Sequence, residues 1–192
     1  MSAERFSLNS PALPVDPEAV TRSLGSTLAT RHGVGGASTR GVVVAGSPVL
    51  SLHHLAAHLV AAAEQRGGVV SIGPLEGRDL RELADLAERA VDGLPIEWPV
   101  VPVRPGLNLD HCMISTRGDV EVVGQTVWGD RHLDLAAAAV GVAARFGSAV
   151  VAPLVDAYGA DGVDLLTLDV CQQLNAVATE VGWPDVGTLD RA

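Results

Sequence analysis

The stretch that decides the fold begins with RPGLNLDHCMI at 104–114 and ends with WGDRHLDLA at 128–136. Between these segments, two short apolar runs flank the tetrapeptide TRGD, which is typical of a tight turn. The second segment leads into an alanine-rich run with helical spacing of its apolar residues. The stretch therefore predicts a β-hairpin, with strands at 111–115 and 120–124, followed closely by a helix.

Helical spacing dominates the chain on both sides of this stretch. The first helix has a clear start, because Asp16 can cap it and Pro17 suits its first position, and Gly33 ends it. Residues 98–103 are rich in strand-forming residues but contain two prolines, which is typical of an edge strand. The predicted fold class is α+β and mostly helical, with helices at 17–33, 51–66, 78–91, 133–146, 150–158 and 163–181.

The length of the chain indicates one folded domain of ordinary size or two very small ones. The chain has 192 residues, of which 47% are hydrophobic and 19% charged, and this is too apolar for a disordered chain. We expect residues 1–15 to form a flexible N-terminal arm and residues 16–192 to form the domain.

No apolar run reaches the roughly 18 residues that a spanning helix needs. The N-terminus also lacks the apolar stretch of a secretory signal. We therefore expect a cytoplasmic protein with no membrane segment.

The charge of the chain excludes several classes of function. There are 23 acidic against 13 basic residues, which gives a net charge of −10, and every basic residue is an arginine. An acidic surface repels phosphate backbones, so no nucleic-acid partner is expected. Because the sequence contains no lysine, Schiff-base chemistry, Walker-type phosphate loops and the phosphate-holding lysine of kinases are excluded.

The quoted segments resemble the C-terminal lobe of the aminoglycoside phosphotransferase family, a small-molecule branch of the kinase-like fold. That family has a catalytic loop His-Gly-Asp-x-x-x-x-Asn, a β-hairpin, a metal-binding Asp, and a helix start Gly/Ala-Asp-Arg-x-x-Asp-Leu-Ala. The loop falls on 104–111 and the helix start on 129–136, while LVDAYG at 154–159 fits a further family segment. The resemblance implies a kinase-like C-lobe that begins near Asp16, with the family's N-terminal β-lobe absent.

The residues that carry the family's chemistry are replaced in this sequence. The catalytic Asp of the family falls on Gly106, and the metal-binding Asn falls on His111. The second metal ligand is missing too, because no Asp lies in the segment 124–127. Each group that acts in the transition state contributes several kcal/mol, at about 1.4 kcal/mol per factor of ten in rate. The resemblance therefore implies a degenerate relative, a pseudokinase, that does not transfer phosphoryl groups.

Three residues of the helix-start motif are kept, namely Asp130, Arg131 and Asp134. We expect them to be structural and to brace the backbone of the former catalytic loop at the start of a helix. No catalytic residue is expected. The candidate ligand-binding residues are those in and beside the loop, Arg104, Asp110 and His111.

Two alternatives start from the same loop. In the first, another chain supplies the nucleotide lobe, and Asp110 serves as the base of an ATP- and Mg²⁺-dependent small-molecule phosphotransferase. In the second, His111 and Cys112 contribute to a metal-binding or hydrolytic site. The pseudokinase interpretation implies no metal site. His54 and His58 lie four positions apart, as a metal-binding pair on a helix would, but we interpret them as histidines on the surface of a helix.

The sequence thus predicts a binding module rather than an enzyme. The absent N-lobe leaves a surface uncovered, formed by Trp98, the hairpin and the pair Asp110–His111, and such a surface favours a protein partner or self-association. The net charge is compatible with a cationic small molecule. No cofactor is expected, unless the phosphotransferase alternative holds.

Overall fold

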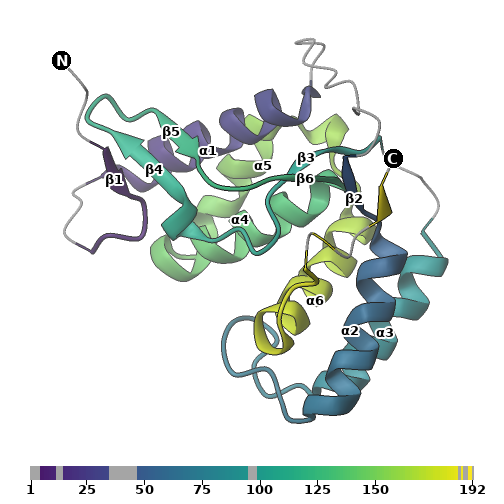
Figure 1. Cartoon of the computed structure of the whole chain (residues 1–192). Coiled ribbons are helices and arrows are strands. Elements are labelled where there is room, and N and C mark those ends of the chain that lie inside the picture. Colours follow the sequence, from purple (N-terminus) through teal and green to yellow (C-terminus); the bar gives the residue numbers. More distant parts are fainter. Residues whose placement is uncertain are drawn as a thin grey trace. The chain divides into compact units, whose positions relative to one another are not determined.

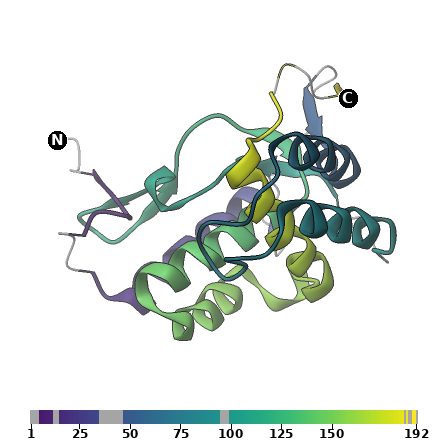
Figure 2. The ribbon, with the colours of Figure 1, turned by 90° about the horizontal axis from the view of Figure 1, so that it is seen from below.

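The computed structural model describes residues 5–11, 15–34, 47–94, 99–185, 187 and 190–191 (Figures 1 and 2). The chain divides into two compact units, each made of three segments. The first unit contains Met1–Arg40, Leu107–Gln125 and Ala137–Val163. The second unit contains Gly41–Gly106, Thr126–Ala136 and Asp164–Ala192.

The first unit combines a small antiparallel sheet with two packed helices. Its strands β1 (Arg5–Ser7), β4 (Cys112–Ser115) and β5 (Val120–Val122) form a sheet in the order β1-β4-β5. Strands β4 and β5 are the predicted hairpin, in which Ile114 pairs with Val120. Helix α1 (Pro17–His32) packs against α5 (Val151–Tyr158) and also contacts β5.

Local signals set the ends of α1 as the sequence predicts. The Asp16 carboxylate accepts the backbone N–H groups of Glu18 and Ala19, and Pro17 occupies the first turn. The helix packs closely on α5 at Gly25, where a Cβ atom would lie 2.4 Å from the carbonyl oxygen of Leu154. A glycine at this point lets the two helix backbones approach each other.

The second unit packs three helices beside a mixed sheet (Figures 1 and 2). Helices α2 (Leu52–Arg66), α3 (Leu80–Asp92) and α6 (Leu165–Val181) contact one another in all three pairs. Their apolar faces share one core that includes Leu59, Leu83 and Leu174. The sheet has the order β3-β6-β2-β7 and is built from β2 (Pro48–Leu50), β3 (Val101–Val103), β6 (Val127–Gly129) and β7 (Asp190–Arg191).

Helix α4 (Arg131–Phe146) belongs to both units, because the division falls between Ala136 and Ala137. The fold is α+β and mostly helical, as predicted, and the six predicted helices lie within a few residues of their expected bounds. Strand β3 lies at an edge of its sheet, which suits Pro102 within it. Within the described residues, none of the helices combines the length and the apolar character needed to cross a bilayer.

Some expectations need correction. The arm predicted for residues 1–15 is not free over its described part, because Arg5–Ser7 pairs with β4 and Leu8 is completely buried. His111 does not begin a strand, since Leu109–His111 forms a 3-10 turn ahead of β4. Trp98 lies outside the described residues. That residues 16–192 form a single domain remains a prediction.

Candidate functional site

The loop 104–106 is fixed at its first residue by a buried carboxylate. The backbone N–H of Arg104 donates to Oδ1 of Asp134 at 2.9 Å, and the Asp134 side chain is completely buried near the start of α4. The loop follows directly after β3, whose residues Val101 and Val103 belong to the core of the second unit. The backbone of the loop is therefore held in place by its own strand and by α4.

The third residue of the loop, Gly106, is covered by the side chain of Trp183. The φ angle of Gly106 is 66°, a conformation that L-residues with side chains rarely adopt. A Cβ atom built at this position would lie 3.0 Å from Nε1 and 3.2 Å from Cδ1 of Trp183. The indole ring thus occupies the space into which a side chain at position 106 would extend.

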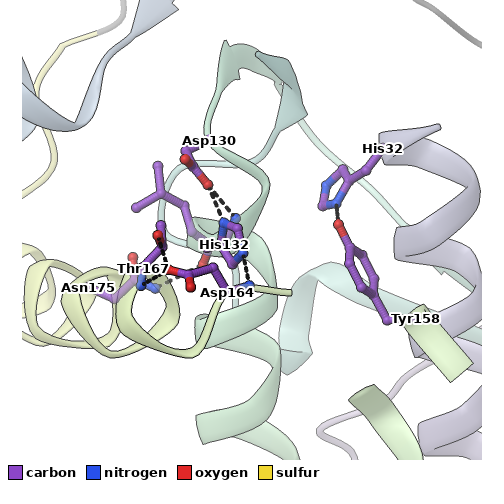
Figure 3. Close-up of polar contacts among 8 residues, drawn as sticks. His32, Asp130, His132, Tyr158, Asp164, Thr167 and Asn175 are labelled. Carbon is purple, nitrogen blue, oxygen red and sulfur yellow. Dashed lines mark hydrogen bonds and ion pairs between the residues drawn. The ribbon is translucent and has the colours of Figure 1, made fainter. Parts of the chain in front are cut away.

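A buried histidine joins the start of α4 to the start of α6 (Figure 3). His132 is completely buried, and its Nδ1 lies 2.7 Å from Oδ1 of Asp130. Its Nε2 accepts the backbone N–H of Asp164 at 3.0 Å. Because Nε2 is the acceptor, the neutral ring carries its proton on Nδ1 and donates it to Asp130. Both ring nitrogens are engaged, so the ring links the Asp130 carboxylate to the backbone of Asp164.

The same region stabilises the first turn of α6. The Asp164 carboxylate caps the helix and accepts the side-chain hydroxyl and the backbone N–H of Thr167, at 2.6 and 2.8 Å. These two bonds, the hydroxyl first, lower the pKa of Asp164. One turn further, burial and then the charge of Asp130 raise the pKa of the Cys171 thiol. Cys171 is thus a buried thiol and not a nucleophile.

The other candidate residues lie in the first unit, in the 3-10 turn that precedes β4. Nδ1 of His111 accepts the backbone N–H of Asn108 at 3.3 Å, in a capping arrangement. The thiol of Cys112 is buried and donates to the carbonyl oxygen of Asn108 at 3.6 Å. Asp110 is exposed, and Oδ1 of its carboxylate accepts the Ser7 hydroxyl at 3.3 Å.

The structure thus places the predicted ligand-binding residues in two different units. Arg104 belongs to the second unit, whereas Asp110 and His111 belong to the first. Asp130, Arg131 and Asp134 lie together at the start of α4, in the second unit. Arg131 is 9% exposed and Asp134 is completely buried, which suits groups that hold backbone in place.

The residues at the positions of the family's catalytic loop do not fit a magnesium-bound nucleotide. At Gly106 the loop offers no carboxylate, and Trp183 fills the adjoining space. Nδ1 of His111 already accepts the backbone N–H of Asn108 at 3.3 Å, so this nitrogen is not available as a cation ligand. Among the described residues, no three His, Cys, Asp or Glu side chains come together as metal ligands.

The histidines of α2 lie apart from this region in the chain. His53, His54 and His58 are exposed, and Nε2 of His53 lies 3.4 Å from the Asp92 carboxylate. An exposed pair of this kind contributes little to stability.

Trp183 and His132 were not singled out from the sequence as site residues. His132 lies between Arg131 and Asp134 in the helix-start motif, so its position next to two motif residues was a usable signal. Trp183 follows the glycine that ends α6 and has no local pattern that points to Gly106. Only the folded chain brings these two residues together.

Comparison with solved structures identifies the fold. The chain is similar to a crystal structure of an aminoglycoside-3'-phosphotransferase of type VIII, with a TM-score of 0.69 and 15% identity over 92% of this chain and 66% of that one. It is also similar to a macrolide 2'-phosphotransferase type I, with a TM-score of 0.56 and 19% identity over 100% of this chain and 67% of that one. The third similar structure is the choline kinase LicA from Streptococcus pneumoniae, with a TM-score of 0.57 and 14% identity over 95% of this chain and 63% of that one.

These likenesses confirm the predicted resemblance at the level of the fold, which is the phosphotransferase-type, kinase-like fold. The chain spans about two thirds of the length of each of these structures. No protein-family model and no curated protein sequence matches the chain.

Proposed function

We propose that this chain is a kinase-fold protein that transfers no phosphoryl group and serves as a binding module. The observation that carries the proposal is the contact between Gly106 and Trp183. Gly106 is the position at which the family resemblance puts the catalytic Asp. There the backbone has a φ of 66° and the indole ring fills the space beside it.

The chemistry of the sequence supports the same conclusion. Phosphoryl transfer depends on a residue that orients the attacking group, on carboxylate and amide ligands for Mg²⁺, and on a cation that holds the phosphates. The chain has no lysine, and the positions that match the first two roles hold Gly106 and His111. Each missing group costs several kcal/mol of transition-state stabilisation, so the losses together leave a negligible rate.

Nucleotide binding tests this proposal directly. Titration calorimetry with ATP and GTP, each with and without Mg²⁺, is expected to give no binding heat, and millimolar nucleotide is expected to leave the Tm unchanged. Gly106→Asp is the informative variant. It is expected to lower the Tm without creating activity, because the new side chain meets the Trp183 ring in a strained backbone. Magnesium-dependent nucleotide binding by the unmodified chain contradicts the proposal.

The ligand that we propose is a cationic small molecule or a partner with a basic surface. The net charge of −10 attracts cations over a distance, although screening weakens the attraction at physiological salt. We also propose that the chain associates with itself when no other protein is bound. Light scattering at micromolar concentration checks it, and a monomer there rules it out.

An alternative function is a phosphotransferase that another chain completes. The observation in its favour is the exposure of Asp110, whose carboxylate accepts the Ser7 hydroxyl at 3.3 Å. In that case ATP and Mg²⁺ would be the cofactors and Asp110 the base. Asp110→Asn must then abolish turnover in the presence of the second chain, and an unchanged rate eliminates this alternative.

A further inference from the structure

In the first unit, helix α1 covers the outer edge of strand β5, and the two elements lie next to each other in Figure 1. The backbone N–H of Val120 donates to Oγ of Ser23 at 3.1 Å, and the Thr27 hydroxyl donates to the carbonyl oxygen of Val120 at 2.9 Å. One turn further along the helix, the Arg31 guanidinium reaches the carbonyl oxygen of Val122 at 3.5 Å. One face of α1 therefore follows the strand from Val120 to Val122.

An open groove of about 440 Å³ lies along this junction. One wall contains Val120, and the other lining residues are polar, namely Ser23, Ser26, Thr27, Thr30, Arg31 and Asp119. All of them belong to the first unit. A hydroxyl group can both donate and accept a hydrogen bond, so this lining suits a polar molecule.

The two charged residues of the groove lie toward opposite ends of it. Asp119 is exposed and directly precedes Val120, which places it at the Ser23 end. Arg31 reaches Val122 at the other end. The three strand steps from 119 to 122 cover about 10 Å, and the eight helix steps from 23 to 31 cover about 12 Å. The groove is therefore negative at one end and positive at the other.

We propose that this groove binds a short linear zwitterion, a peptide of about three residues, with its ammonium group at Asp119 and its carboxylate at Arg31. An extended chain of three residues spans about 10 Å, which matches the separation of the two ends. A guanidinium group binds a carboxylate through two parallel hydrogen bonds. The hydroxyl groups between the two ends are suited to the N–H and C=O groups of the peptide.

This inference goes beyond the proposed function. The groove belongs to the first unit, whereas the loop 104–106 belongs to the second. Both charged ends of the groove have access to water, so each ion pair contributes a modest affinity. Selectivity comes from the spacing between the two charges, because a ligand must carry both charges at that distance to use both ends.

Capped peptides test the proposal with the unmodified chain. Triglycine is titrated into the ¹⁵N-labelled protein, and amide shifts are expected at 23–31 and 119–122. N-acetyltriglycine lacks the ammonium group, and triglycine amide lacks the carboxylate. Each is expected to bind about tenfold more weakly than triglycine, and so is glycine, which is too short to reach both ends. Equal affinities for triglycine and its two capped forms overturn the proposal, and so does the absence of shifts at about 10 mM triglycine.

Two variants assign the ends of the ligand. Asp119→Asn is expected to remove the preference for triglycine over N-acetyltriglycine, because it removes the partner of the ammonium group. Arg31→Gln is expected to remove the preference for triglycine over its amide. Arg22→Gln is the control, since Arg22 is a half-exposed arginine of the same helix that pairs with Glu18. If Asp119→Asn and Arg31→Gln both keep the two preferences, these charges do not recognise the peptide ends and the proposal is wrong.

The two proposals fail in different ways. Magnesium-dependent nucleotide binding contradicts the proposed function, whatever triglycine does. Equal binding of triglycine and its capped forms contradicts the peptide groove, while the absence of phosphoryl transfer stands.

Discussion

The carboxylate of Asp134 accepts the backbone N–H of Arg104 at 2.9 Å, between two residues that lie 30 positions apart. The carboxylate is completely buried, so water does not replace it if it is removed. This bond decides where the loop 104–106 lies relative to the start of α4, and the contact between Gly106 and Trp183 depends on that loop.

Asp134→Ala is expected to destabilise the protein by about 2 kcal/mol, because the part-buried N–H of Arg104 loses its acceptor. Asp134→Asn keeps an oxygen in the same place and is expected to cost less. Urea unfolding measures both variants. A cost below about 0.5 kcal/mol for the alanine variant, the range of ordinary surface substitutions, contradicts the assigned role.

His132→Phe is expected to cost about 3 kcal/mol. The phenyl ring leaves the Asp164 N–H without its acceptor and removes the imidazole partner of the Asp130 carboxylate, which keeps the backbone N–H of residue 132. The measurement is again urea unfolding, with His58→Phe on the exposed face of α2 as the matched control. Equal losses in the free energy of unfolding for the two substitutions would show that the hydrogen bonds of His132 do not stabilise the protein.

Asp164→Ala is expected to cost about 1 kcal/mol near neutral pH, since it removes the cap of α6. The bonds from Thr167 lower the pKa of Asp164 below its ordinary value of 3.8. Its contribution is therefore complete above the pKa of the unfolded chain and is lost as the pH falls below 3.8 toward the folded value.

The variant should thus differ from the unmodified chain at pH 6 and converge with it near pH 2. Thermal unfolding across this range measures the difference. Asp169→Ala on the same helix is the control, because its carboxylate is exposed and accepts only from Gln173. If the difference in thermal stability between the variant and the unmodified chain persists at pH 2, the stability does not depend on the ionisation of Asp164.

Gly25→Ala is expected to destabilise the protein by about 2 kcal/mol, although alanine is the better helix former by about 1 kcal/mol. The new methyl group would lie 2.4 Å from the carbonyl oxygen of Leu154, and backbone cannot move aside easily. Gly141→Ala is the control, because its methyl group meets the flexible side chain of Leu109 at 3.1 Å. Denaturant unfolding should separate the two variants by more than 1 kcal/mol.

Part of the candidate site could be read from the sequence. The resemblance singled out Asp130, Arg131 and Asp134 from a motif eight residues long, and the structure shows Asp134 bonded to the loop. The partners of His132 could not be read in this way. Its Nε2 bonds to Asp164, which is 32 positions away, and no local pattern encodes that distance.

By itself the sequence determined the helices and the hairpin of this protein. Capping by Asp16, apolar spacing and the turn between β4 and β5 act within a few residues, and local interactions of this kind leave local signals. Tertiary structure alone decided that β2 pairs in parallel with β6, that β7 returns to β2, and that Trp183 covers Gly106. These contacts join distant segments, and the free energy that selects them comes from burial and backbone pairing in the whole fold, which no short stretch of sequence contains.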